Sequence, residues 1–197
     1  YPPEYNGRAP VNPADPMPVE FANYKTSVLF VDDLLGRVFA DLDERALADN
    51  TVVLISADHG EEFNENGDGI KGHGSGYSRQ QLGVPMLLAW PGVEPKRFTH
   101  RTSHYDVAPT LMRRLLGCIN AGSDYSSGHD LYDGPQWDWL IAGSYYNYAV
   151  LEPEQITVTF PNGTYEVRDN NYRLLNSPQF NSDVLESVMR ENTRFHK

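Results

Sequence analysis

The chain of 197 residues is long enough to bury one hydrophobic core, so one domain with a small second lobe is expected. Its formal net charge of −11 at pH 7 argues against a nucleic-acid binder or a polybasic membrane clamp. Cys118 is the only cysteine, which excludes a disulfide framework and a thiolate metal cluster. Any anion site must therefore be made locally, by a metal ion or by a few basic side chains.

The N-terminal part predicts an extended arm and then a long helix. Residues 1–18 hold six prolines and few apolar side chains, which is typical of an extended segment. Apolar residues then recur at alternating steps of three and four, the spacing of one helical face. They are Phe21, Tyr24, Val28, Val31, Leu35, Val38 and Leu42. This spacing predicts an amphipathic helix over about residues 19–47, packed on a sheet.

Two apolar runs predict strands of a mostly parallel sheet. Thr51–Ile55 is β-branched and continuously hydrophobic, the pattern of a strand buried on both faces, and Val84–Trp90 predicts a second buried strand. A loop rich in Gly, Asn and Glu separates them. Loops of this length without regular structure are usually functional or mobile.

The C-terminal part predicts a different architecture. Asp106 is expected to cap a helix over Val107–Leu116, which Gly117 ends. Aromatic and β-branched runs then predict a small antiparallel sheet and a last helix that starts at Ser182 or Asp183. The expected strands are Leu140–Val150, Gln155–Phe160 and Thr164–Arg168, with a hairpin turn at Pro161–Gly163. The predicted organisation is an arm (1–18), an α/β domain (19–135) and a small antiparallel lobe with a helix (136–197).

The first predicted strand ends at Asp58-His59-Gly60. In open α/β sheets, ligands bind at the carboxyl ends of the strands. A carboxylate oxygen beside an imidazole suits a divalent cation, and glycine permits a sharp turn close to a ligand. The alternative is an ordinary acidic turn.

Four motifs occur in one order along residues 20–120 and carry a family resemblance. They are Asp58-His59-Gly60, His73-Gly74, Val84–Leu88 with Trp90–Gly92, and Asp106–Leu111. Together they resemble the C-terminal half of the sulfatase branch of the alkaline phosphatase superfamily. The implied fold is a partial α/β alkaline phosphatase-like (sulfatase) sandwich with a small antiparallel C-terminal lobe.

Within that branch, the tail resembles the YejM-type (PbgA-like) inner-membrane proteins. The residues that carry this likeness are Thr110–Leu116, Tyr125–Leu131 and the Asn162-Gly163 hairpin. The resemblance implies a periplasmic domain at the bacterial inner membrane, carried by N-terminal membrane helices. It also implies that the nucleophile (Thr, Ser or a modified Cys) and other acidic ligands lie in a preceding half of the domain. That half is the expected partner, and this chain alone is expected to be inactive.

The resemblance assigns roles to four residues. Asp58 and His59 are the expected ligands of a divalent metal (Mn, Mg, Zn or Ca). His73 matches the histidine that contacts the transferred group in phosphoethanolamine-type transferases, so it is the candidate catalytic and substrate-binding residue. Lys71 is a second substrate-binding candidate. The expected function is metal-dependent hydrolysis or transfer at sulfate or phosphate esters. The alternative is a non-catalytic module that binds anionic lipid head groups of the envelope, such as cardiolipin or lipopolysaccharide, and regulates other proteins.

For several further residues, the sequence allows two interpretations. A carboxylate or carbonyl is expected to orient the second nitrogen of His59, and Glu61 or Glu62 either fills this role or is a solvated loop acid. A basic loop around His100 and His104 either contacts an anionic head group or is simply solvated. A group of C-terminal rings either forms the core of the small sheet or a lipid or glycan surface. That group is His129, Trp137, Trp139, Tyr145, Tyr146 and Tyr148.

Overall fold

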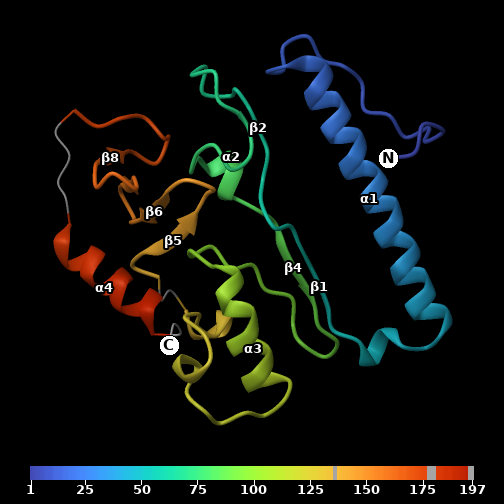
Figure 1. Ribbon diagram of the computed structural model, residues 1–197. Coiled ribbons are helices and arrows are strands. Elements are labelled where there is room, and N and C mark those ends of the chain that lie inside the picture. The colour runs from blue at the N-terminus through green and yellow to red at the C-terminus, as the bar shows by residue number, and fades with distance from the viewer. Residues whose placement is uncertain (135–136, 177–180, 195–197) are drawn as a thin grey trace. The chain divides into compact units, whose positions relative to one another are not determined.

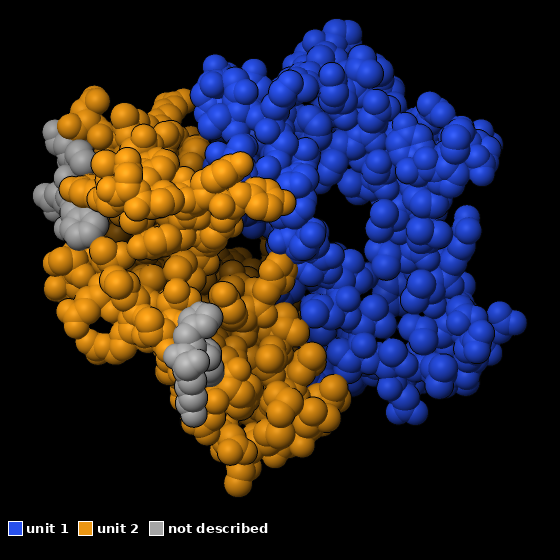
Figure 2. Space-filling model, viewed as in Figure 1, with its two compact units in different colours: residues 1–94 blue, residues 95–197 orange. Residues whose placement is uncertain are grey.

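The computed structural model describes residues 1–134, 137–176 and 181–194 (Figure 1). The chain divides into two compact units, residues 1–94 and residues 95–197 (Figure 2). The sequence predicts a domain boundary near residue 135, whereas these two units divide between residues 94 and 95. The division into an arm, an α/β domain and a small lobe stays a prediction.

The first unit begins with an arm that lies along helix α1 (Pro18–Glu44). The helix confirms the predicted 19–47 to within three residues, with a proline in its first turn, where the missing N–H costs nothing. The Tyr5 hydroxyl donates to Asp33 on the helix at 2.7 Å, and this hydrogen bond raises the pKa of Tyr5. The Thr26 hydroxyl accepts the backbone N–H of Ala9 at 3.1 Å. These contacts attach the arm to one side of α1.

The apolar stripe of α1 is largely exposed, which corrects the prediction that it packs on a sheet. Only Ala22 and Thr26 of the helix are buried among the described residues. Near the start of the helix, Phe21 and Tyr24 pack against Phe63, with ring centroids 5.0 and 5.3 Å apart. The rest of the stripe, from Val28 to Val38, is half-exposed or more at most positions. Spacing alone predicts which face is apolar, but not what covers it.

Strands β1 (Val53–Ser56) and β4 (Met86–Ala89) lie where the sequence predicts strands, but they pair antiparallel. The predicted parallel pairing is therefore wrong for these strands, and all the strand pairs within the described ranges are antiparallel. The predicted burial is wrong as well, since Leu54 is 39 % and Leu87 58 % exposed. An apolar run indicates a preference for burial. The direction in which the strand pairs and the elements that cover it depend on residues outside the run.

Between these strands lie three short elements that position the candidate site. They are β2 (Glu62–Phe63), β3 (Lys71–Gly72) and helix α2 (Arg79–Leu82). Strands β2 and β3 pair antiparallel, with Glu62 opposite Gly72 and Phe63 opposite Lys71. The segment predicted as a loop without evident structure therefore contains a small hairpin and a helical turn.

The second unit contains the predicted antiparallel sheet, in the order β5-β6-β7-β8. Its strands are β5 (Leu140–Gly143), β6 (Tyr148–Leu151), β7 (Ile156–Thr159) and β8 (Tyr165–Arg168). The run predicted as one strand is two, because Ser144 accepts hydrogen bonds from the backbone N–H groups of Tyr146 and Asn147 and closes a turn. The predicted turn between β7 and β8 is confirmed, with Gly163 at φ 82°. Buried side chains of the sheet include Ala149, Val150, Ile156, Val158 and Val167.

Two helices complete the second unit, α3 (Val107–Arg114) and α4 (Ser182–Thr193). Both were predicted, but the role of Asp106 differs. Its side chain does not cap α3; it accepts the backbone N–H of Ser103 at 2.7 Å and closes the preceding helical turn, η2 (His104–Asp106). The remaining short helical turns are η1 (Ala48–Asn50), η3 (Gly122–Asp124) and η4 (Leu131–Asp133). No helix in the described part of the chain is long and apolar enough to span a membrane.

The basic loop before α3 attaches to the sheet. Arg101 donates to the carbonyl oxygens of Leu151 and Glu152 at 2.9 and 3.0 Å, and burial lowers the pKa of its guanidinium. His100 packs edge-on against Phe98, with ring centroids 5.6 Å apart. Arg101 thus has a structural partner within its own unit.

Candidate metal and anion site

The turn after β1 requires a glycine at position 60. A Cβ added at Gly60 would lie 2.0 Å from the carbonyl oxygen of Gln80, a backbone atom that cannot swing away. The N–H of Gly60 also donates to the carbonyl oxygen of Gln81 at 2.8 Å. This close approach holds the Asp58–Gly60 turn against helix α2, so the glycine is required here by the backbone of α2.

His59 is oriented by the backbone, as predicted. Its Nδ1 lies 2.9 Å from the carbonyl oxygen of Gly60. A carbonyl oxygen can only accept, so Nδ1 carries the proton of this bond and Nε2 presents a lone pair. That Nε2 lies 3.7 Å from Oδ2 of Asp58, while Oδ1 of Asp58 accepts the backbone N–H of His59 at 3.0 Å. Two ligands about 2.1 Å from one tetrahedral ion lie about 3.4 Å apart, so this spacing is close to that of a shared metal.

His73 lies directly against His59. The two imidazole rings stack with centroids 3.9 Å apart and planes inclined by 25°. Nδ1 of His73 lies 2.8 Å from a carboxylate oxygen of Glu61, which fixes the ring and leaves Nε2 on the other side. Glu61 is therefore a partner of His73, a role that the sequence analysis missed because it weighed this residue only toward His59.

The neighbouring Glu62 supports the site from inside. Its side chain is fully buried, and its carboxylate accepts from the Ser78 hydroxyl at 2.7 Å, from the Gln81 amide at 2.8 Å and from the Asn66 amide at 3.1 Å. The expectation that Glu62 is either a solvated acid or the partner of His59 is therefore wrong. Its three donors hold β2, the hairpin loop and α2 together. The Ser-x-x-Gln spacing of Ser78 and Gln81 indicates the start of helix α2, where the Ser78 hydroxyl accepts the backbone N–H of Gln81.

The donor set fits a divalent metal. His59, Glu61 and His73 offer ligand atoms that all lie within 4.8 Å of one another. Asp58, whose side chain is 88 % exposed, adds a fourth ligand atom, a carboxylate oxygen, beside His59. Imidazole nitrogen together with carboxylate oxygen suits Zn or Mn, and carboxylates alone suit Mg or Ca. The structure thus brings together Asp58, His59 and His73. Lys71 is exposed on β3, on the same hairpin.

The remaining candidates lie in the second unit. Tyr145 and Tyr146 are 85 % and 80 % exposed, so the prediction that these two rings form the core of the sheet is wrong. Their turn, which the sequence analysis took as strand, places both side chains outside the sheet. His129 and Trp137 are half-buried and pack edge to face, with ring centroids 4.9 Å apart.

Comparison with known proteins shows the family of the chain and its fold. A family model described as Sulfatase matches residues 1–117, so the chain belongs to the sulfatase family. Its fold is alkaline phosphatase-like. A crystal structure of the phosphonate monoester hydrolase of Agrobacterium radiobacter superposes with a TM-score of 0.64 at 18 % identity, over 88 % of this chain and 41 % of that one.

Among curated proteins, the inner membrane protein YejM of Salmonella typhimurium is 30 % identical over 173 residues, which are 87 % of this chain and 29 % of that protein. The steryl-sulfatase of Rattus norvegicus is 34 % identical over 120 residues, 55 % of this chain and 21 % of the relative. The chain thus spans less than a third of the length of these relatives.

Proposed function

We propose that this chain supplies part of the active site of a metal-dependent hydrolase or transferase that acts on sulfate or phosphate esters. The observation that carries the proposal is the junction of Asp58, His59 and His73, in which each imidazole has its Nδ1 fixed and its Nε2 available. Membership of the sulfatase family supports the same chemistry. The active protein is a longer one, held at the bacterial inner membrane on its periplasmic side, as the similarity to YejM supports.

Asp58 and His59 would hold the metal in this proposal. A divalent ion bound there would neutralise charge on the ester oxygens and on the attacking group. The chain itself fixes the donors: the Gly60 carbonyl sets the tautomer and direction of His59, and the peptide N–H of His59 holds the Asp58 carboxylate. The nucleophile and further ligands belong to a preceding segment of the longer protein, which is the proposed partner of this chain.

His73 would act on the substrate. When both ring nitrogens carry a proton, Nδ1 donates to Glu61 and Nε2 can donate a hydrogen bond to a tetrahedral anion or a proton to a leaving oxygen. Lys71 would add positive charge toward the same anion. A sulfate or phosphate ester and a lipid head group that carries a phosphate share this anionic chemistry.

The experiment replaces His73 by alanine in the complete protein. We expect turnover of phosphate or sulfate esters to fall by about 100-fold, because general acid–base assistance is typically worth 10²–10⁴. Metal content, measured by mass spectrometry of the digested protein, should stay near the wild-type stoichiometry. Loss of the metal in this variant would place His73 among the ligands, with His59 and Glu61, and would contradict its assignment to the substrate.

A matched pair of lysine variants distinguishes the effect of a positive charge at the site from the effect of the protein's net charge. Lys71→Ala should raise the KM for an anionic ester, while Lys96→Ala, which removes a lysine of the second unit that packs on Phe98, should not. A wild-type protein that is folded, holds metal and turns over none of the esters would instead favour the alternative, a non-catalytic module that binds anionic envelope lipid.

A further inference from the structure

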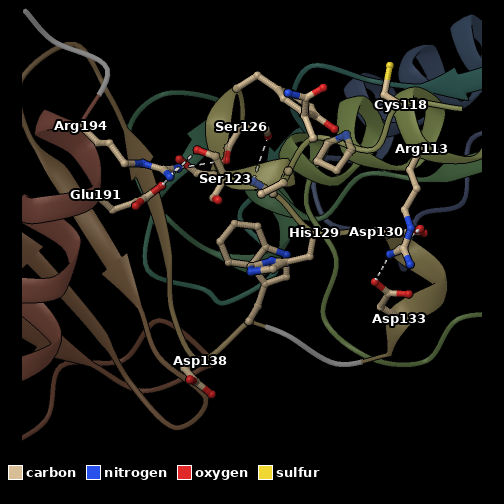
Figure 3. A pocket seen from close by; sticks show the side chains of 18 of the residues that line it. Arg113, Cys118, Ser123, Ser126, His129, Asp130, Asp133, Asp138, Glu191 and Arg194 are labelled. Carbon is tan, nitrogen blue, oxygen red and sulfur yellow. Dashed lines mark hydrogen bonds and ion pairs between the residues drawn. The ribbon is translucent and has the colours of Figure 1, made fainter. Parts of the chain in front are cut away.

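The second unit contains a cavity that shares no residue with the site described above. Its volume is about 900 Å³, within the range of about 300–1,000 Å³ that is typical of small-molecule sites. Its walls come from the C-terminal end of α3 and the chain that follows it, from residues 137–139, and from one face of α4. Figure 3 shows Glu191 of α4 and Arg194, the residue after α4, on one side of this cavity and Arg113 with Asp133 on the other.

One wall is aromatic and rigid. The indole N–H of Trp137 lies 3.0 and 2.9 Å from the two carboxylate oxygens of Asp106, which is 3 % exposed. The same carboxylate accepts the backbone N–H of His129 at 2.8 Å, and the His129 ring packs edge to face on the indole. A buried carboxylate thus fixes a half-buried ring at the cavity wall. Trp137 and Trp139 also line a second, smaller cavity of about 210 Å³.

The arginine side chains of the wall already have partners. Arg113 forms an ion pair with Asp133 at 2.7 Å. Arg194 pairs with Glu191 and donates to the carbonyl oxygen of Ser126 at 3.0 Å. Arg190, the third lining arginine, pairs with Glu186 at 2.7 Å. Each guanidinium is therefore neutralised within its own unit, so the wall offers no unpaired positive charge that would attract a phosphate or sulfate.

The same pairs present donors and acceptors side by side. A guanidinium can only donate hydrogen bonds, and an ionised carboxylate can only accept them. A wall built of such pairs can therefore bond fully to a ligand group that both donates and accepts hydrogen bonds. A hydroxyl group both donates and accepts, whereas a simple cation interacts only with the carboxylate of a pair and a simple anion only with the guanidinium. The apolar C–H face of a sugar ring has, in addition, the size and flatness to stack on an indole.

We infer that this cavity binds a neutral glycan, with a pyranose ring stacked on Trp139 beside the fixed indole of Trp137 and its hydroxyls bonded to the Arg–carboxylate pairs. This site is separate in its residues from the proposed ester chemistry and does not depend on it. The glycan is either a free oligosaccharide or the sugar part of a larger envelope molecule.

The test is binding of the complete wild-type protein to an array of neutral oligosaccharides, with the best one then titrated by calorimetry both free and linked to a lipid. We expect Trp139→Ala to weaken binding at least ~10-fold, as truncation of a central aromatic anchor does. Trp137→Phe, which keeps a ring but loses the bond to Asp106, should weaken it by less. Trp90→Ala, the third tryptophan, which lies in the first unit, is the matched control and should bind like wild type.

Three outcomes decide the inference. Weaker binding in the Trp139 variant, with an unchanged melting temperature, supports it. Failure of the folded wild-type protein to bind any neutral glycan would overturn it, as would equal binding by the Trp139 and Trp90 variants. Binding of inorganic phosphate or choline at this cavity, without competition from any sugar, would likewise overturn it. Such a result would mean that the cavity binds a charged ligand and not a neutral glycan.

Discussion

Replacement of His59 by alanine should abolish stoichiometric divalent metal in the complete protein and lower ester turnover by at least ~100-fold. His59 is the residue that both possible ligand sets share, namely the pair with Asp58 and the triad with Glu61 and His73. The Gly60 carbonyl oxygen holds its Nδ1, which leaves Nε2 for a metal. Loss of this donor removes the charge stabilisation that a metal gives to the reacting ester.

Metal analysis and initial rates on the same preparations provide the measurement. His100→Ala is the control for metal content, because that histidine lies in the second unit, against Phe98. Retention of full activity by a His59 variant that has lost its metal would refute a metal-dependent reaction. Retention of both metal and activity would refute the ligand assignment.

Gly60→Ala is expected to cause a large loss of stability. The added methyl would meet the Gln80 carbonyl oxygen at 2.0 Å, so the Asp58–Gly60 turn must move away from α2 and weaken the 2.8 Å bond to Gln81. Overpacking against backbone, together with one lost hydrogen bond, should lower the free energy of unfolding by about 3 kcal/mol. The same movement should weaken metal binding, since it displaces His59.

Gly36→Ala is the matched control for this variant. Gly36 lies inside α1, and a Cβ there would meet no atom within 4 Å. Alanine should therefore raise the stability of the helix by about 1 kcal/mol. Melting temperatures of the two variants should move in opposite directions. A Gly60 variant as stable as wild type would show that the turn is not held in the close approach described.

The elements set by local sequence were predictable. The three–four spacing from Phe21 specifies α1, and Asn162-Gly163 specifies a hairpin turn, because both signals lie within a few residues of the structure they determine. The junction of Asp58 and His59 was predictable for the same reason. Their adjacency in sequence places both donors at the end of one strand.

The features that depend on distant residues were not predictable. The direction in which β1 and β4 pair, and the exposure of Leu54 and Leu87, depend on neighbours in space and not on the apolar run. The pairing of Glu61 with His73 depends on the hairpin between β2 and β3, whose strands are only two residues long. Sequence periodicity carries no signal for strands so short.

The most direct test of the metal site is X-ray diffraction from crystals of the complete protein loaded with zinc or manganese, recorded at the absorption edge of the metal. The account predicts an anomalous peak about 2.0–2.3 Å from Nε2 of His59 and from a carboxylate oxygen of Asp58, with Nδ1 of His59 still bonded to Gly60. A peak elsewhere in the protein, with Asp58 and His59 bonded only to each other and to solvent, would contradict it.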